Sequence, residues 1–253
     1  GIAGLEAARV AALRGHQVTI FEKSLQIGGQ LLIASVPPRK EEMMRSINYY
    51  CNVLPELDVT FRLGQEFSEK DYASFDEVIV ATGATNAIIP VPGKDLPTVV
   101  SAWDVLAKKE IVFGKVSVIG GGLVGVETAE YLASRGCKVT IVEMMDQIAK
   151  EESNTVLPTL MKELNSHEVE VLTSAKLMEI TENTVIVEKT VDEKTEKVEV
   201  ASDFVVMAVG AKKNVVELNN CTLPIHYVGD CAGERPSNID HAIKSAYDVA
   251  CEL

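Results

Sequence analysis

The sequence predicts an α/β fold made of two nested, three-layer domains, each built around a parallel sheet. Two observations predict this fold: an internal repeat, and short apolar runs that each end in a turn of small residues. Residues 1–22 return at 122–143 with eleven of 22 positions identical and no gap. Each copy contains a glycine turn, a small-residue helix, a β-branched strand and an acidic residue at the strand's end. This order of elements is typical of a Rossmann-like dinucleotide-binding domain.

The second copy contains every part of the motif. An apolar strand at 115–119 runs into the spaced glycines of G-x-G-x-x-G, which are Gly120, Gly122 and Gly125. The first glycine permits a tight reversal, the second lets a pyrophosphate approach the backbone, and the third allows close contact between helix and strand. The helix expected from about Leu123 would direct its N-terminal amides at the phosphates. Residues 115–143 are therefore predicted to bind a dinucleotide.

Glu143 closes this second copy. It lies 21 residues beyond Gly122, where a carboxylate can accept hydrogen bonds from an adenosine ribose. No arginine follows it in residues 144–150 to balance a 2′-phosphate. The pattern favours NADH over NADPH.

The first copy starts inside its own motif, because Gly1 aligns with Gly122 and Gly4 aligns with Gly125. The preceding strand and the first glycine are absent from the sequence. In a doubly wound sheet that first strand is usually central, so we expect the sheet of this domain to open or its neighbours to fill the gap. We interpret the chain as a fragment of a longer protein.

Later segments fit two nested domains. Residues 75–83 and 204–210 are continuously apolar and end in small-residue turns, as buried strands do. A further strand is expected at 225–230 and an amphipathic helix at 239–253. Residues 168–200 are predicted to form strands, with a solvated hairpin turn near Asp192, Glu193 and Lys194.

Several motifs together carry a resemblance to a known family. They are the opening GxxG with Glu22, the IGGQL segment at 27–31, VPP at 36–38, ATG at 81–83, the complete second motif, AVG at 208–210 and VGDC at 228–231. The chain resembles the two-dinucleotide-binding flavoproteins. Within them it is most similar to the C-terminal part of the NADH:flavin oxidoreductases related to 2,4-dienoyl-CoA reductase, 2-enoate reductase and trimethylamine dehydrogenase. The similarity covers essentially the whole chain.

The resemblance implies two domains with different cofactors. A discontinuous domain, 1–98 and 220–253, would hold FAD, and an inserted domain, 99–219, would hold NAD(H). The residues implied to contact FAD are Gly1, Gly4, Glu22, Lys23, Gly29, Gln30, Leu31, Ala81, Thr82, Gly83, Gly229 and Asp230. Those implied to contact NADH are Gly120, Gly122, Leu123, Val124, Gly125, Glu127, Glu143 and Gly210. Glu127 stays open between a nicotinamide contact and a carboxylate favoured by the helix dipole, because Glu6 repeats it in the first copy.

The resemblance also implies parts that this sequence does not contain. In the family an N-terminal barrel carries FMN and the substrate site, and a cysteine cluster carries a 4Fe-4S centre. The five cysteines here include no C-x-x-C, which supports neither a redox dithiol nor a cluster site. The four histidines have no metal-ligand spacing. We therefore predict no metal site and no catalytic side chain in this chain.

Composition excludes some partners. The formal net charge of −13 argues against nucleic acid and anionic membrane surfaces, because both require clustered Lys and Arg. No apolar run approaches the roughly 20 residues of a membrane helix. These features are typical of a soluble cytoplasmic module whose partners are small dinucleotides and the implied barrel. Open strand edges would also permit an oligomer.

Three functional hypotheses follow. In the first, hydride passes from NADH to FAD, and electrons continue to the FMN and iron–sulfur barrel, which reduces an enoate- or dienoyl-type substrate. In the second, the chain is a non-catalytic module that binds ADP, as in an amine dehydrogenase. In the third, the fragment cannot bind FAD and retains only an NADH site.

Overall fold

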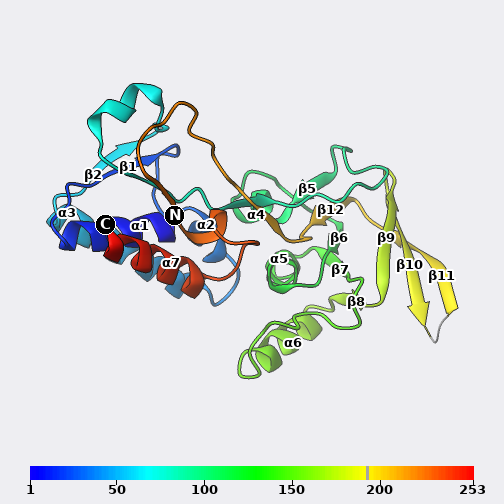
Figure 1. Ribbon diagram of the computed structural model, residues 1–253. Helices are drawn as coiled ribbons and strands as arrows, with labels where there is room; N and C mark the ends of the chain where they lie inside the picture. Colours follow the sequence, from blue (N-terminus) through cyan, green and yellow to red (C-terminus); the bar gives the residue numbers. More distant parts are fainter. Residues whose placement is uncertain (192–193) are drawn as a thin grey trace. The chain divides into compact units, whose positions relative to one another are not determined.

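The computed structural model describes residues 1–191 and 194–253, which form two compact units (Figure 1). Unit 1 contains residues 1–35, 41–85 and 211–253. Unit 2 contains residues 36–40 and 86–210. Among the described residues, no helix combines the length and the apolar character needed to cross a membrane.

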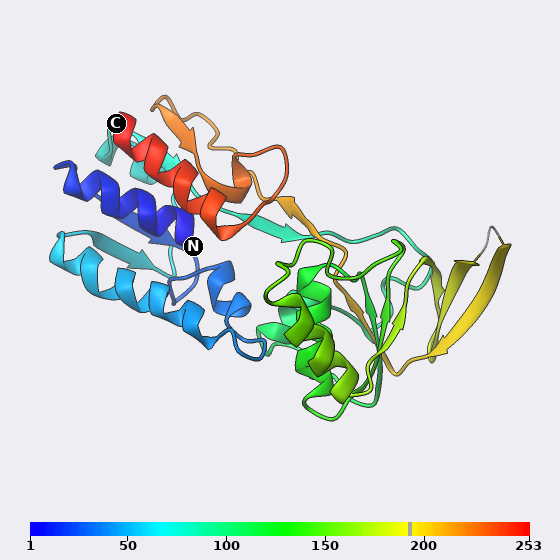
Figure 2. The same cartoon turned by 90° about the horizontal axis from the view of Figure 1, so that it is seen from below.

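Three helices form one layer of unit 1: α1 (Ile2–Leu13), α3 (Met44–Glu56) and α7 (Ile239–Glu252). Figure 2 shows α1 lying between the other two. The side of α1 toward α7 consists of alanines and valines, which pack on Ala242, Ala246 and Ala250 of α7. Small side chains on both helices allow their backbones to approach closely. The side chains between α1 and α3 are larger: Leu5 of α1 packs with Ile47 and Leu54 of α3.

The remaining elements of unit 1 are short. They are α2 (Gln30–Ala34), β1 (Thr19–Glu22), β2 (Thr60–Leu63), β3 (Val78–Val80), β4 (Ala84–Asn86), β13 (Ala211–Lys213), β14 (Ile225–Tyr227) and three 3₁₀ turns, η1 (Glu41–Met43), η2 (Glu69–Ser74) and η3 (Gly229–Cys231). β4 starts in unit 1 and ends at Asn86 of unit 2.

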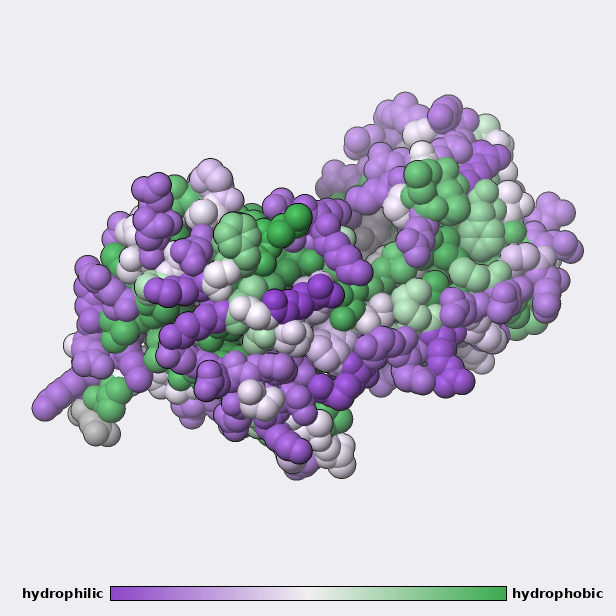
Figure 3. Space-filling view, turned by 180° about the vertical axis from the view of Figure 1, so that it is seen from behind, coloured by the Kyte–Doolittle hydropathy of each residue, from purple (hydrophilic) through white to green (hydrophobic). Residues whose placement is uncertain are grey.

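The parallel strands of unit 1 form two separate pairs, which agrees with the first of the two expectations, that this sheet opens, and not with the second, that its neighbours fill the gap. β1 pairs with β2, and β3 pairs with β14, both in parallel, but the described strands of the two pairs are not joined to each other. A parallel sheet is normally buried on both faces. Here every residue of β1 and β14 is only half-buried. Figure 3 shows that the face of the molecule seen there has apolar areas between hydrophilic ones.

Unit 2 contains a complete five-stranded parallel sheet in the order β5-β12-β6-β7-β8. Its strands are β5 (Val99–Ser101), β6 (Lys115–Ile119), β7 (Lys138–Val142), β8 (Glu170–Leu172) and β12 (Phe204–Met207). Its helices are α4 (Ala102–Leu106), α5 (Leu123–Ala133) and α6 (Leu157–Ser166). The prediction of a Rossmann-like parallel sheet is confirmed.

A three-stranded antiparallel sheet completes unit 2. It consists of β9 (Ala175–Ile180), β10 (Thr184–Val191) and β11 (Lys194–Ala201), with β10 in the centre. Val185 and Val187 of β10 are fully buried against the parallel sheet. Residues 168–200 were predicted to form strands, and the structure has strands there; two residues of the predicted turn, 192 and 193, lie outside the described residues.

The two units change over at 85/86 and 210/211, whereas the sequence placed the boundaries at 98/99 and 219/220. Packing explains the first difference. The Ile180 amide donates to the carbonyl of Pro92 at 2.9 Å, and a Cβ on Gly93 would lie 1.9 Å from the Ile180 carbonyl oxygen. Ile89, Val91 and Leu96 also pack on the unit 2 core. The proline-rich stretch therefore belongs to unit 2.

Candidate dinucleotide-binding sites

The glycine turn of unit 2 joins β6 to α5. Gly120 has φ of 105°, in the region that favours glycine. A Cβ on Gly125 would lie 1.9 Å from the Gly120 carbonyl oxygen, so helix and turn are in direct contact there. A Cβ on Gly122 would meet no atom within 4 Å. Two glycines are thus required by the protein's own packing, and the third leaves its backbone open on the side where a ligand could approach.

Glu143 fixes the middle of this turn from the end of β7. Its side chain is buried, and its two carboxylate oxygens accept hydrogen bonds from the backbone amides of Gly121 and Met145. The Ala149 amide donates to the Gly121 carbonyl at 2.7 Å. The segment after β7 therefore holds both polar groups of Gly121. A carboxylate has about four lone-pair sites, so Glu143 can still accept a ligand hydroxyl.

Other predicted residues lie around the same turn. Leu123 is the first residue of α5, and Val124 is 41% exposed. A Cβ on Gly120 would lie 2.4 Å from the Ala208 carbonyl oxygen, which brings the end of β12 beside the turn. Gly210 follows two residues later with φ of 97° and an exposed backbone. The predicted residues of the second motif are thus close to one another.

A five-residue segment of unit 2, residues 36–40, is called the strap. It binds two carboxylates that are three residues apart on α5. Lys40 Nζ lies 2.7 Å from Glu127 Oε1. Arg39 forms a bidentate pair with Glu130, at 2.7 Å and 2.9 Å. The Glu130 side chain is only 3% exposed, so its charge depends on this guanidinium.

The strap was missed by the sequence analysis. The available signal was the basic dipeptide Arg39-Lys40 directly after two prolines, together with Glu127 and Glu130 on one face of the expected helix. The ion pair with Lys40 supplies a structural role for Glu127 beside the two that the sequence left open. A nicotinamide contact for Glu127 stays a prediction.

In unit 1, segments far apart in sequence meet near the start of α1. Gly29 has φ of 53°, and a Cβ there would lie 2.8 Å from the Cα of Gly1. A Cβ on Gly83 would lie 3.0 Å from Gln30 Nε2. Gln30 Nε2 donates to Asp230 Oδ2 at 3.4 Å. Four of the predicted segments therefore converge at one end of the unit.

The remaining predicted residues of unit 1 differ in their surroundings. Glu22 accepts hydrogen bonds from the amide and hydroxyl of Ser24, both at 2.9 Å. The Thr82 hydroxyl donates to the Asn214 carbonyl. Leu31 is buried in the core, so only its backbone can face a ligand. The others are Lys23, which is exposed, Gly4 and Ala81, which approach each other, and Gly229, whose Cβ would lie 2.8 Å from the Ala3 Cβ.

The cysteines of the described residues are all free, and none pairs with another. Cys231 is buried, and its thiol donates toward the carbonyls of Val80 and Val228. Burial raises the pKa of the Cys137 thiol. Buried thiols of this kind pack as small apolar groups and are weak nucleophiles.

Two α/β units in one chain, each with glycines at the start of a helix and an acid at the end of the next strand, define a protein with two Rossmann-like units of the dinucleotide-binding type. Residues 1–246 match the family described as pyridine nucleotide-disulphide oxidoreductase. The chain belongs to this family of flavin- and pyridine-nucleotide-dependent oxidoreductases.

The relatives of this chain include reductases. It is 47% identical to a bilirubin reductase of Mediterraneibacter gnavus, over 99% of this chain and 39% of that protein. It is 34% identical to a cinnamate reductase of Clostridium sporogenes, over 99% of this chain and 38% of that protein. A solved 2-naphthoyl-CoA reductase superposes with a TM-score of 0.92 at 28% identity, over the whole of this chain and 38% of the other.

These similarities confirm the resemblance to the two-dinucleotide-binding flavoproteins. The chain spans about 39% of the length of the relatives it matches. Activities that belong to those whole proteins are therefore matters of proposal for this one.

Proposed function

We propose that this chain is an NADH-dependent flavin reductase module, in which unit 2 binds NADH and unit 1 binds FAD. NADH, when bound, supplies a hydride that FAD accepts. The observation that carries this proposal is the glycine turn of unit 2. Its outer glycines are packed against the protein's own backbone, and Gly122 alone leaves open space. A turn of this geometry accommodates a pyrophosphate at the backbone.

In unit 2, the residues would bind and orient NADH. The amides at the start of α5, at Leu123 and Val124, would face the pyrophosphate with the positive end of the helix dipole. Glu143 would accept hydrogen bonds from the adenosine ribose while it continues to hold Gly121. The same carboxylate would repel a 2′-phosphate, so we propose that NADH is preferred over NADPH.

In unit 1, the residues would bind FAD at the converging segments. Gly1, Gly4 and Gly29 would leave room for the pyrophosphate, and Glu22 would accept hydrogen bonds from the adenosine ribose. Asp230 would accept a hydrogen bond from the ribityl chain, because one of its oxygens is bonded only weakly, to Gln30 at 3.4 Å. These groups fit FAD, since glycines that bring two backbone segments close together lie beside carboxylates at strand ends.

No side chain is needed as an acid or a base for this step, so the protein's contribution is position and electrostatics. We further propose that electrons leave the flavin toward an FMN and 4Fe-4S domain elsewhere in the whole protein. That domain would reduce an enoate- or dienoyl-type substrate. This agrees with the names of the cinnamate and 2-naphthoyl-CoA reductases to which the chain is similar.

The test is the visible absorption spectrum of the purified chain, recorded before and after NADH is added without oxygen. The proposal predicts a flavin spectrum that bleaches on addition of NADH. Glu143→Ala should keep the flavin spectrum and require more NADH for the same bleaching. Binding of ADP with no binding of NADH would favour the non-catalytic alternative. A colourless protein that takes up no FAD would overturn the assignment of unit 1.

A further inference from the structure

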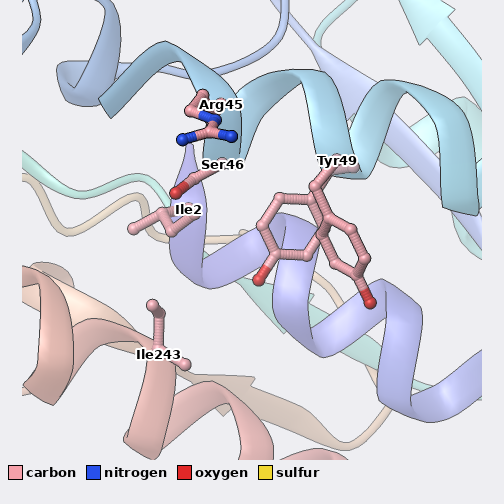
Figure 4. A pocket seen from close by; sticks show the side chains of 6 residues that line it. Ile2, Arg45, Ser46, Tyr49 and Ile243 are labelled. Atoms are coloured by element: carbon pink, nitrogen blue, oxygen red, sulfur yellow. The ribbon is translucent and has the colours of Figure 1, made fainter. Parts of the chain in front are cut away.

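An open surface hollow of about 280 Å³, called the cavity below, lies in unit 1 on the outer side of the helix layer, and the proposed dinucleotide sites do not use its side chains. Figure 4 shows its walls. Arg45, Ser46 and Tyr49 line the wall formed by α3, and Ile2 and Ile243 line the opposite walls, formed by α1 and α7. The cavity therefore has a polar side with one positive charge and an apolar side.

The sixth lining residue, Tyr50, belongs to a completed polar network beneath the surface of helices α1 and α3. The Tyr50 hydroxyl donates to Glu6 Oε2 at 2.9 Å. Arg9 donates to both oxygens of Glu6 at 2.8 Å. Because Glu6 is buried and its charge is balanced by Arg9, this network offers no unpaired charge to a ligand.

The groups on the α3 wall are available. Within the described residues, neither the Ser46 nor the Tyr49 hydroxyl forms a hydrogen bond in the protein. Arg45 pairs with Glu42 at 2.8 Å, but both side chains are more than three-quarters exposed. A surface ion pair of this kind contributes little to stability, so the Arg45 guanidinium can exchange Glu42 for another carboxylate at low cost.

The volume of the cavity limits the size of the ligand that it can hold. A cavity of about 150 Å³ holds one benzene molecule, and this cavity has about 280 Å³. It can therefore take one ring together with a short polar side chain. A guanidinium with neighbouring hydroxyls favours a carboxylate at the polar end, and two isoleucines favour a ring at the other.

We propose that this cavity binds a small aromatic carboxylate, with its ring between Ile2 and Ile243 and its carboxylate on Arg45 and Ser46. The proposal is independent of the hydride step, because it uses none of the residues assigned to FAD or NADH. It would give the module a second small-molecule site, beside the two dinucleotide sites.

The test uses the full chain and three related probes in isothermal titration calorimetry. 3-Phenylpropionate has both the ring and the charge, 3-phenylpropan-1-ol has only the ring, and propionate has only the charge. The first should bind about tenfold or more tightly than either of the others, since a hydrogen bond to a charged group contributes about 1.5–3 kcal/mol. Equal binding of the three probes, or no binding of the first, would overturn the proposal.

Variants of Arg45 and Glu42 should change the affinity for 3-phenylpropionate in opposite directions. Arg45→Gln should weaken 3-phenylpropionate by about tenfold or more. Glu42→Gln should strengthen it by up to about fivefold, because it frees the guanidinium. Arg45→Lys keeps the charge but loses the planar fork, so its affinity should lie between Arg45→Gln and the unchanged protein. Circular dichroism checks that each variant is folded.

Two controls test whether the probe binds in this cavity. Lys244 follows Ile243 in α7, and its exposed ammonium group pairs with Asp248. Lys244→Gln removes this charge and should leave the affinity for the probe unchanged. Saturating FAD and NADH should also leave it unchanged. If either dinucleotide displaces the probe, or Arg45→Gln binds it like the unchanged protein, the cavity is not the site.

Discussion

The two copies of the repeat keep the same backbone pattern but balance equivalent carboxylates in different ways. Glu6 in α1 is paired with Arg9 of the same helix and with Tyr50 of α3. Its equivalent in α5, Glu127, is paired with Lys40 of the strap. The position of Arg9 is occupied in the second copy by Glu130, so the second helix cannot balance its own charge. The strap supplies the missing cations.

The glycines and strand-end acids differ as well. A Cβ on Gly125 would clash with backbone at 1.9 Å, whereas a Cβ on Gly4 would lie 3.2 Å from the Cβ of Ala81. Glu143 is buried and bound to two backbone amides, whereas Glu22 is half-buried and accepts hydrogen bonds from the amide and hydroxyl of Ser24. Half-identical sequences thus produce tight packing at Gly125 and Glu143 and looser packing at Gly4 and Glu22.

The largest expected difference concerns the third glycine. Gly125→Ala should destabilise unit 2 by about 3 kcal/mol, because helix and turn must separate, and should abolish NADH binding. Gly4→Ala should stay within about 1 kcal/mol of the unchanged protein. Urea unfolding followed by the fluorescence of Trp103, the one tryptophan of the chain, reports on unit 2. Circular dichroism follows the helices of both units, so a transition that leaves the Trp103 fluorescence unchanged reports on unit 1. Equal losses would contradict the contrast.

The next contrast concerns the strand-end acids. Glu143→Ala removes the acceptor of two backbone amides and should cost about 2 kcal/mol, together with a clear loss of NADH affinity. Glu22→Ala should cost about 0.5 kcal/mol, because its bonds are exposed. The same urea and NADH titrations measure both. Unchanged NADH affinity in Glu143→Ala would remove this residue from the site, and Glu143→Gln should restore part of the stability.

The strap gives a smaller effect. Arg39→Gln leaves the buried carboxylate of Glu130 without its guanidinium and should cost about 1–2 kcal/mol. Arg9→Gln should cost less, since Glu6 keeps the hydroxyl of Tyr50. Unfolding of the two variants in urea measures the difference. No loss in Arg39→Gln would show that the strap does not stabilise unit 2, and a larger loss in Arg9→Gln would contradict the predicted order.

The repeat explains how much could be predicted from sequence. A glycine motif in register with strand, helix and acid is a local pattern, and it predicted the turn at Gly120–Gly125 and the buried strands around it. The open sheet of unit 1 followed from the same comparison of copies. These predictions depend on residues that lie within about thirty positions of one another.

The parts that were not predicted depend on contacts between distant residues. Arg39 and Glu130 are 91 residues apart, and no local pattern connects them. The first boundary between the two units lies at 85/86 and was expected at 98/99. The difference arises because Gly93 packs against Ile180, and the sequence gives no sign of this contact. Leu31 was assigned to the flavin side from its motif, but its side chain packs in the core beside Leu5. Motifs place a backbone, and packing decides where each side chain points.

The smallest expected difference between the two copies is in how their stability depends on pH. Burial, and next the charge of Glu6, raise the pKa of Tyr50 above its usual range. A tyrosine whose pKa is higher in the folded state stabilises the fold fully below about pH 10, its unfolded value, and this stabilisation is lost as the pH rises further. The second copy has a lysine from the strap where the first has this hydroxyl. Unit 1 should therefore lose stability first in mild alkali.

Tyr50→Phe isolates this contribution. Near neutral pH the variant should lose about 1 kcal/mol, because Glu6 keeps both hydrogen bonds from Arg9 and gives up only one. Above about pH 10 the loss should shrink, since phenylalanine has no proton to release. Urea unfolding of unit 1 by circular dichroism, between about pH 8 and about pH 11, measures both. If unit 1 loses the same stability in alkali with and without the Tyr50 hydroxyl, other groups control this loss. The carboxylates of the two copies would then have different partners but the same response to pH.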